Sequence, residues 1–142
     1  MNYSSSQISL ITDSLLEDIA EWQKRPLLDQ YAVIWIDAID YKTRQENKVV
    51  SKACMLVLGI DINGKQDILS MSIVQKESAA AWSSILDDLK SRGVEDILFL
   101  CSENPTGLNK ALEAAFPQSI HQICIVHQVR NALKYVATRI EK

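Results

Sequence analysis

Several features of secreted and membrane proteins are missing from this sequence. Its three cysteines, an odd number, do not suggest a disulfide framework, and each lies in an apolar run typical of a strand. We therefore expect reduced, buried thiols in a cytoplasmic protein. No apolar run approaches the ~18 residues of a membrane span, and residues 1–6 lack the charged and apolar regions of a signal peptide. These absences exclude the membrane and secretory classes.

An excess of positive charge is also missing. The 142 residues include 15 Lys and Arg against 18 Asp and Glu, a formal net charge of -3. This balance excludes a nucleic-acid binder that acts through bulk positive charge, so any such contact must be local. Apolar residues, by contrast, make up 47% of the chain, and a chain of this length can bury roughly 68–70% of its unfolded surface. Folding therefore needs neither disulfides nor a metal.

The spacing of apolar residues predicts nine segments of secondary structure. Helices are indicated by apolar residues three and four apart, and strands by short apolar runs rich in β-branched side chains. Asn63-Gly64 is a tight-turn signal, while Gly93 and Pro117 end helices. The expected segments are, in order, a helix at residues 8–23, strands at 32–36, 49–60 and 65–74, a helix at 81–89, a strand at 96–101, a helix at 108–116, a strand at 120–126 and a helix at 129–140.

This order predicts an α/β fold with a ribonuclease H-like mixed sheet. The first three strands should form an antiparallel meander, and the helix that follows should return the fourth strand parallel beside the first. Helices flank the five strands, and the helix at residues 8–23 is an extra N-terminal one. A flavodoxin-like sheet is disfavoured because it does not begin with an antiparallel hairpin. The polar residues 42–48 are expected to connect the first two strands.

Two carboxylates are expected to meet at one edge of this sheet. Asp37 ends the first strand and Glu103 follows the fourth, and the carboxyl ends of parallel neighbours emerge together. Paired carboxylates there can hold Mg²⁺ for phosphodiester chemistry. The alternative is that both are solvated loop acids, because fold does not fix function. Asp40 is a further candidate only if the strand has already ended.

The residues His121, Cys124 and His127 have the spacing of a candidate zinc site, but the pattern is weak. Residues three apart on a strand point to opposite faces, so His121 and Cys124 should diverge. No fourth ligand is evident nearby. We therefore expect Cys124 and His127 to be structural, with a buried thiol and an imidazole that hydrogen-bonds locally.

The last predicted helix carries a small basic side in an otherwise acidic protein. Arg130 and Lys134 lie four residues apart, a spacing that places both on one helix face, where they could contact nucleic-acid phosphates. The alternative is a solvated face whose cations are favoured by the helix dipole. Sequence alone leaves both interpretations open.

Longer motifs resemble one family over nearly the whole chain. The most specific is Cys124-Ile125-Val126-His127-Gln128-Val129-Arg130-Asn131, which is hard to obtain by chance. It resembles the Mutator-type transposases of bacterial insertion sequences. Other stretches that fit the same family are Ile11-Thr12-Asp13, Glu21-Trp22-Gln23, Arg25-Pro26-Leu27, Val50-Ser51-Lys52-Ala53 and Leu89-Lys90 with Arg92-Gly93-Val94.

This resemblance implies a catalytic core that uses an Asp-Asp-Glu triad with Mg²⁺ or Mn²⁺ to cut element ends and join them to target DNA. Asp37 matches the first aspartate. Glu103 stands where the second aspartate is expected, and Asn104-Pro105 replaces the Gly-Leu that follows it. The third acid lies in the family beyond Lys142. We therefore divide the chain into an N-terminal helix with its connection, residues 1–29, and a core truncated before the third acid, residues 30–142.

The sequence thus predicts the catalytic-core fragment of a DNA transposase, inactive as this chain, in which Asp37 and Glu103 would be catalytic and metal-binding. Arg130 and Lys134 would contact the DNA of element ends and target, and the helix at residues 8–23 could form a homo-oligomer surface. The alternative is a non-catalytic DNA-associated or oligomerisation module that retains the fold. A stand-alone nuclease would need further acids at the site.

Overall fold

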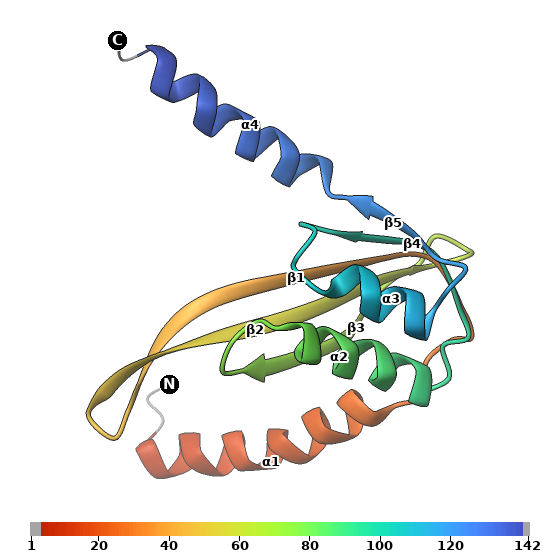
Figure 1. Cartoon of the computed structure of the whole chain (residues 1–142). Coiled ribbons are helices and arrows are strands. Elements are labelled where there is room, and N and C mark those ends of the chain that lie inside the picture. The colour runs from red at the N-terminus through yellow and green to blue at the C-terminus, as the bar shows by residue number, and fades with distance from the viewer. Residues whose placement is uncertain (1–3, 141–142) are drawn as a thin grey trace.

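A five-stranded mixed sheet organises the molecule (Figure 1). The structure is a computed structural model that describes the backbone of residues 4–140 and their side chains except at 5–8 and 134–140. Its elements are α1 (Ser5–Lys24), β1 (Gln30–Gln45), β2 (Lys48–Asp61), β3 (Gln66–Val74), α2 (Ala79–Ser91), β4 (Asp96–Ser102), α3 (Leu108–Ala115), β5 (Ile120–Ile123) and α4 (Ile125–Ile140).

The strand order β3-β2-β1-β4-β5 confirms the predicted ribonuclease H-like sheet. β1 pairs antiparallel with β2, and β2 with β3, whereas β4 runs parallel between β1 and β5. The chain reaches β4 through α2, as a parallel neighbour requires. The carboxyl end of β4 therefore lies beside Trp35 and the residues that follow it in β1.

The first strand is longer than the sequence predicts. β1 does not end at Asp37 but continues to Gln45, and residues 42–48 are the end of a hairpin rather than a connection. Glu46 and Asn47 turn the chain with φ of 47° and 61°, as two-residue hairpins require. Half-buried and exposed residues alternate in this part of β1, but most of the side chains there are polar or charged, so no apolar alternation marks it. We call residues 38–52 the ribbon.

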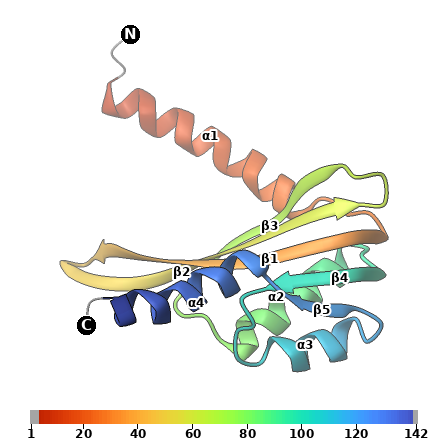
Figure 2. The same ribbon diagram turned by 90° about the horizontal axis from the view of Figure 1, so that it is seen from above.

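The hydrophobic core lies between one face of the sheet and the helices α2 and α3 (Figure 2). In β2, Ala53, Met55 and Val57 are fully buried while the alternate residues are half-buried. The helical face predicted for α2 is confirmed, with Trp82, Ile85, Leu86 and Leu89 all buried. Trp35 and the three cysteines, expected in the core, are only half-buried.

The fifth strand is shorter than predicted, and the last helix begins earlier. β5 ends at Ile123, whereas the sequence suggests a strand to residue 126. The Cys124 N–H donates to the Ser102 carbonyl at 2.8 Å, which completes the pairing with β4, and the Cys124 carbonyl accepts from the Gln128 N–H at 3.0 Å, which begins α4. The β-branched pair Ile125-Val126 conceals this helix start. α4 then extends away from the sheet edge (Figure 1).

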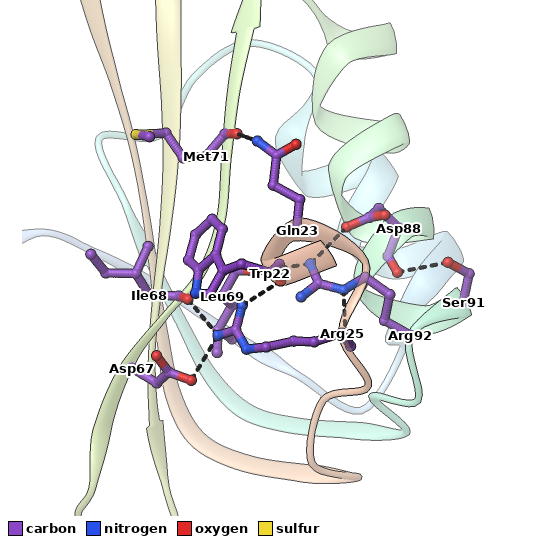
Figure 3. A network of polar contacts seen from close by, with 10 residues as sticks. All are labelled: Trp22, Gln23, Arg25, Asp67, Ile68, Leu69, Met71, Asp88, Ser91 and Arg92. Carbon is purple, nitrogen blue, oxygen red and sulfur yellow. Dashed lines mark hydrogen bonds and ion pairs between the residues drawn. The ribbon is translucent and has the colours of Figure 1, made fainter. Parts of the chain in front are cut away.

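α1 attaches to the sheet mainly through its last turn and the residue that follows it. The Arg25 guanidinium bonds Asp67 at 2.7 Å and the Ile68 carbonyl at 2.8 Å, and lies 4.7 Å from the centre of the Trp22 ring. Gln23 donates to the Met71 carbonyl (Figure 3). The amphipathic helix is confirmed, but most of its apolar side is not covered. The exposed residues are Leu10, Ile11, Leu15, Leu16 and Ile19.

Arg92 ties the same corner to α2. Its guanidinium is buried and donates to the Leu69 carbonyl at 2.8 Å, to the Arg25 carbonyl at 3.0 Å and to Asp88 at 3.2 Å (Figure 3). These bonds join the end of α1, strand β3 and α2 at one point. None of the described helices is both long and apolar enough to cross a membrane.

Candidate metal centre

The parallel pairing of β1 and β4 brings Asp37 and Glu103 together, as the topology predicts. The last paired residues are Trp35 and Cys101, and each acid lies two positions after the paired residue of its own strand. Asp37 is half-buried within β1, where its carboxylate accepts the Ala38 N–H at 2.9 Å. Glu103 is half-exposed and lies just beyond β4. Asp40 is exposed on the continuing strand and does not join them.

The loop that carries Glu103 is fixed from several directions. The Ser102 hydroxyl accepts the Asn104 N–H at 3.0 Å and bonds the His121 Nε2 at 2.7 Å. Burial lowers the pKa of His121. Gly107 begins α3 with a φ of 89°, and a Cβ there would lie 2.4 Å from the Ala79 Cβ. Only glycine therefore allows the loop to lie this close to α2.

His127 is the third residue of the group. Its Nε2 contacts Glu103 Oε1, and the ligand atoms of Asp37, Glu103 and His127 lie within 4.8 Å of one another. The sequence predicts a local hydrogen bond for His127, and the structure places its ring against Glu103, within this group. Because β5 ends early, this histidine falls on the first turn of α4, beside the end of β4.

The zinc spacing does not produce a zinc site in the described part of the chain. His121 bonds Ser102, and Cys124 is half-buried outside the group formed by His127 and the acids. Burial raises the pKa of the Cys101 thiol, and the neighbouring Cys124 adds to this rise. Both thiols are free, as expected.

A third carboxylate, missed by the sequence analysis, faces the same centre. Glu77 lies in the loop between β3 and α2, where no sequence signal could place it. Burial raises its pKa, and the charges of Asp40, Glu103 and Asp37 raise it further. The nearby indole N–H of Trp82 favours the charged carboxylate and so lowers the pKa of Glu77 in part. This N–H is buried, and it lies outside standard hydrogen-bond geometry. The shared cavity, of about 140 Å³, is lined by Ile36, Asp37, Ala38, Glu77, Trp82, Glu103 and Pro105.

The basic residues proposed for phosphate contact lie on α4, beyond His127. Arg130 is exposed, one turn along from His127. Lys134 belongs to the same helix, but its side chain lies outside the described residues. Arg130 therefore places positive charge one turn beyond His127, on the helix that leaves the sheet edge.

Comparison with known proteins places these observations in context. Residues 1–142 match the family model described as "Transposase, Mutator family". The chain is 40% identical over all its residues to a probable transposase for an insertion sequence element of Corynebacterium diphtheriae, covering 41% of that protein. It is 39% identical over 137 residues to the ISRM3 transposase of Rhizobium meliloti (strain 1021), covering 96% of this chain and 34% of that protein. The chain thus spans between about a third and two fifths of the length of these relatives.

Among solved structures, the catalytic core domain of HTLV-2 integrase, determined in complex with magnesium, aligns with 82% of this chain and 74% of its own length. The TM-score is 0.46 and the identity is 15%.

Proposed function

Because the chain belongs to the Mutator family of transposases, we propose that it forms part of the catalytic core of an insertion-sequence transposase. Asp37 and Glu103 would hold Mg²⁺ or Mn²⁺ for cutting and joining DNA. The observation that supports this proposal is the meeting of the two carboxylates where the pairing of β1 with β4 ends. They come from distant parts of the sequence and from the two strands that the topology makes neighbours.

The donor atoms fit a divalent ion after a small adjustment. Two oxygens bound to one Mg²⁺ lie at most about 4.2 Å apart, twice the bond length of about 2.1 Å. The donors of the group lie within 4.8 Å of one another, and the Glu103 side chain is 51% exposed and free to move inward. Nearby Glu77 adds negative charge whenever it is ionised.

The remaining residues would position the reacting strand. A divalent ion held there supplies activation of a water molecule or a 3′-hydroxyl and stabilisation of the leaving oxygen. Asp37 and Glu103 would orient that ion, and the loop anchored by Ser102 would keep Glu103 in place. Arg130 and Lys134 would neutralise phosphates of the bound strand.

We expect this 142-residue chain to bind the ion weakly and to leave DNA uncut. Catalytic groups tolerate only roughly 0.5 Å of misplacement, and Glu103 is one methylene longer than the aspartate that the family pattern implies. Among the described residues, the group contains two carboxylates and one imidazole rather than three carboxylates. Glu103→Asp should therefore not create nicking activity unless the family's third acid is supplied as well.

Titration with Mn²⁺ tests the site, with Asp37→Asn as the variant and Asp40→Asn as the matched control on the same strand. Asp37→Asn should weaken binding by about tenfold or more, whereas Asp40→Asn should change it less than about twofold. Unchanged binding in Asp37→Asn would contradict the proposal. DNA binding without any divalent-ion binding would instead favour the non-catalytic module. A plasmid-nicking assay with Mg²⁺ and Mn²⁺ checks the expected inactivity.

A further inference from the structure

His127 is held in the candidate centre more firmly than the acid it contacts. Its side chain is 19% exposed, against 51% for Glu103. The backbone explains this position, because the Cys124 N–H bonds the Ser102 carbonyl at 2.8 Å. That bond joins the start of α4 to the end of β4, so His127 and Glu103 extend from the two sides of one junction. Their meeting therefore follows from the fold rather than from the reach of two flexible side chains.

The two ring nitrogens of His127 have different surroundings. Nε2 faces Glu103 Oε1 and lies within the group, whereas Nδ1 is buried and has no hydrogen-bond partner among the described residues. A proton on Nδ1 would be unsatisfied, so the metal-free ring favours a proton on Nε2, which donates to Glu103. A cation that replaces this proton would take Nε2 as its ligand, and the proton would pass through solvent to Nδ1.

We propose that His127 is a third protein ligand of this centre, through Nε2, and that it makes the centre prefer Mn²⁺ to Mg²⁺. The proposal depends on the metal site assigned above to Asp37 and Glu103. Mg²⁺ selects oxygen donors, whereas first-row transition ions also accept imidazole nitrogen. A set of two carboxylates and one imidazole therefore favours the transition ion. The proton left on a buried Nδ1 opposes binding, which limits the gain to about tenfold.

A positioning role for His127 predicts a different result. If the ring only held Glu103 in place, its loss would weaken Mg²⁺ and Mn²⁺ equally. His127→Gln separates the two roles, because the glutamine amide can still donate to Glu103 but supplies no imidazole nitrogen. Gln128→Ala is the matched control, since it changes the exposed neighbour of His127 on the same helix and leaves both histidines in place.

The experiment compares Mg²⁺ and Mn²⁺ affinities by calorimetric titration and records electron spin-echo modulation from nitrogen in the Mn²⁺-loaded chain. The unmodified chain should bind Mn²⁺ about tenfold more tightly than Mg²⁺ and show modulation from one imidazole nitrogen. His127→Gln should lose that signal and about tenfold in Mn²⁺ affinity, with less than about threefold for Mg²⁺. Gln128→Ala should retain both. Circular dichroism melting checks that each variant is folded.

Three results would overturn the inference. The first is Mn²⁺ bound without nitrogen modulation, and the second is an equal loss of both ions in His127→Gln. In either case, lost Mn²⁺ binding in Asp37→Asn would leave the carboxylate site standing, so only the role of His127 would fail. The third is a failure of the carboxylate site itself, which would also remove the function proposed above. It would be seen either as no ion binding at all or as Mn²⁺ binding, with its nitrogen signal, that Asp37→Asn leaves unchanged.

Discussion

Glu77 is the residue whose ionisation is most affected by the other acids of the centre. Its pKa lies above the ordinary value because of burial, with further contributions from Asp40, Glu103 and Asp37. The folded chain therefore holds this proton more tightly than the unfolded chain does. The contribution of the protonated Glu77 side chain to the free energy of unfolding is fully present below the pKa of Glu in the unfolded chain. It is lost as the pH rises through the higher pKa of Glu77 in the folded chain.

Glu77→Gln should consequently stabilise the metal-free chain at neutral pH. The amide cannot ionise, so the variant avoids the cost of a buried charge, and its advantage should disappear below about pH 4, where Glu is protonated in both states. Denaturant unfolding in the presence of a chelator, between pH 4 and 8, measures the difference. Glu113→Gln, at an exposed position on α3, is the control. A variant less stable than the original chain at pH 7 would contradict the argument.

At this scale the sequence could identify Asp37 and Glu103 but not their neighbours. Each of the two acids lies just after the paired part of its strand, and the order of the elements implies that these two strands pair in parallel. His127 depends on where β5 stops, and a strand to residue 126 would have placed it at a strand end. Glu77 depends on how the loop before α2 folds back to the sheet, which local pattern does not encode.

Among the elements, α4 is where the proposed nucleic-acid contact can be measured. Because the net charge is -3, phosphate contact must come from local cations. The affinity for duplex DNA falls with rising salt, and Arg130→Ala and Lys134→Ala should each reduce the magnitude of the slope of log affinity against log salt by about 0.9. The reduction should be the same for DNA of any sequence. Lys110→Ala, exposed on α3, is the matched control. An unchanged slope in both α4 variants would remove this helix from the interface.

The helices and strands that pack one face against the core could be predicted from the sequence more accurately than those that do not. α2 and β2 were located correctly because one face of each is packed, so apolar period and structure coincide. The outer part of β1 was missed because its residues are mostly polar or charged, so its alternation of half-buried and exposed positions does not show as an apolar pattern. The start of α4 was missed because Ile125-Val126 has strand propensity, whereas a single backbone bond from Cys124 decides the boundary.

For the whole molecule, the most conspicuous surface is the uncovered apolar side of α1. Ile11 and Leu15 are 48% and 49% exposed and lie one helical turn apart. Exposed apolar stripes of this kind are typical of interfaces. Ile11→Glu with Leu15→Glu should therefore shift the chain toward the monomer.

Sedimentation velocity over a range of concentrations measures this shift. The control is Val49→Glu with Ile62→Glu, which places the same charge on exposed apolar positions outside α1. If the control dissociates the chain as well, or if the unmodified chain is monomeric throughout, α1 is not a self-association surface.

The ribbon has a consequence for the chain's behaviour in concentrated solution. Among the residues that the structure describes, none pairs with β1 on its β4 side beyond Trp35, and β2 pairs with β3 only from Ala53 onward. Two rows of backbone N–H and C=O groups are thus open to the strands of another molecule, the usual starting point for aggregation. Lys42, Arg44 and Lys48 are exposed along these edges, and their mutual repulsion opposes such growth. The cations on the ribbon therefore protect the protein from forming fibrous assemblies.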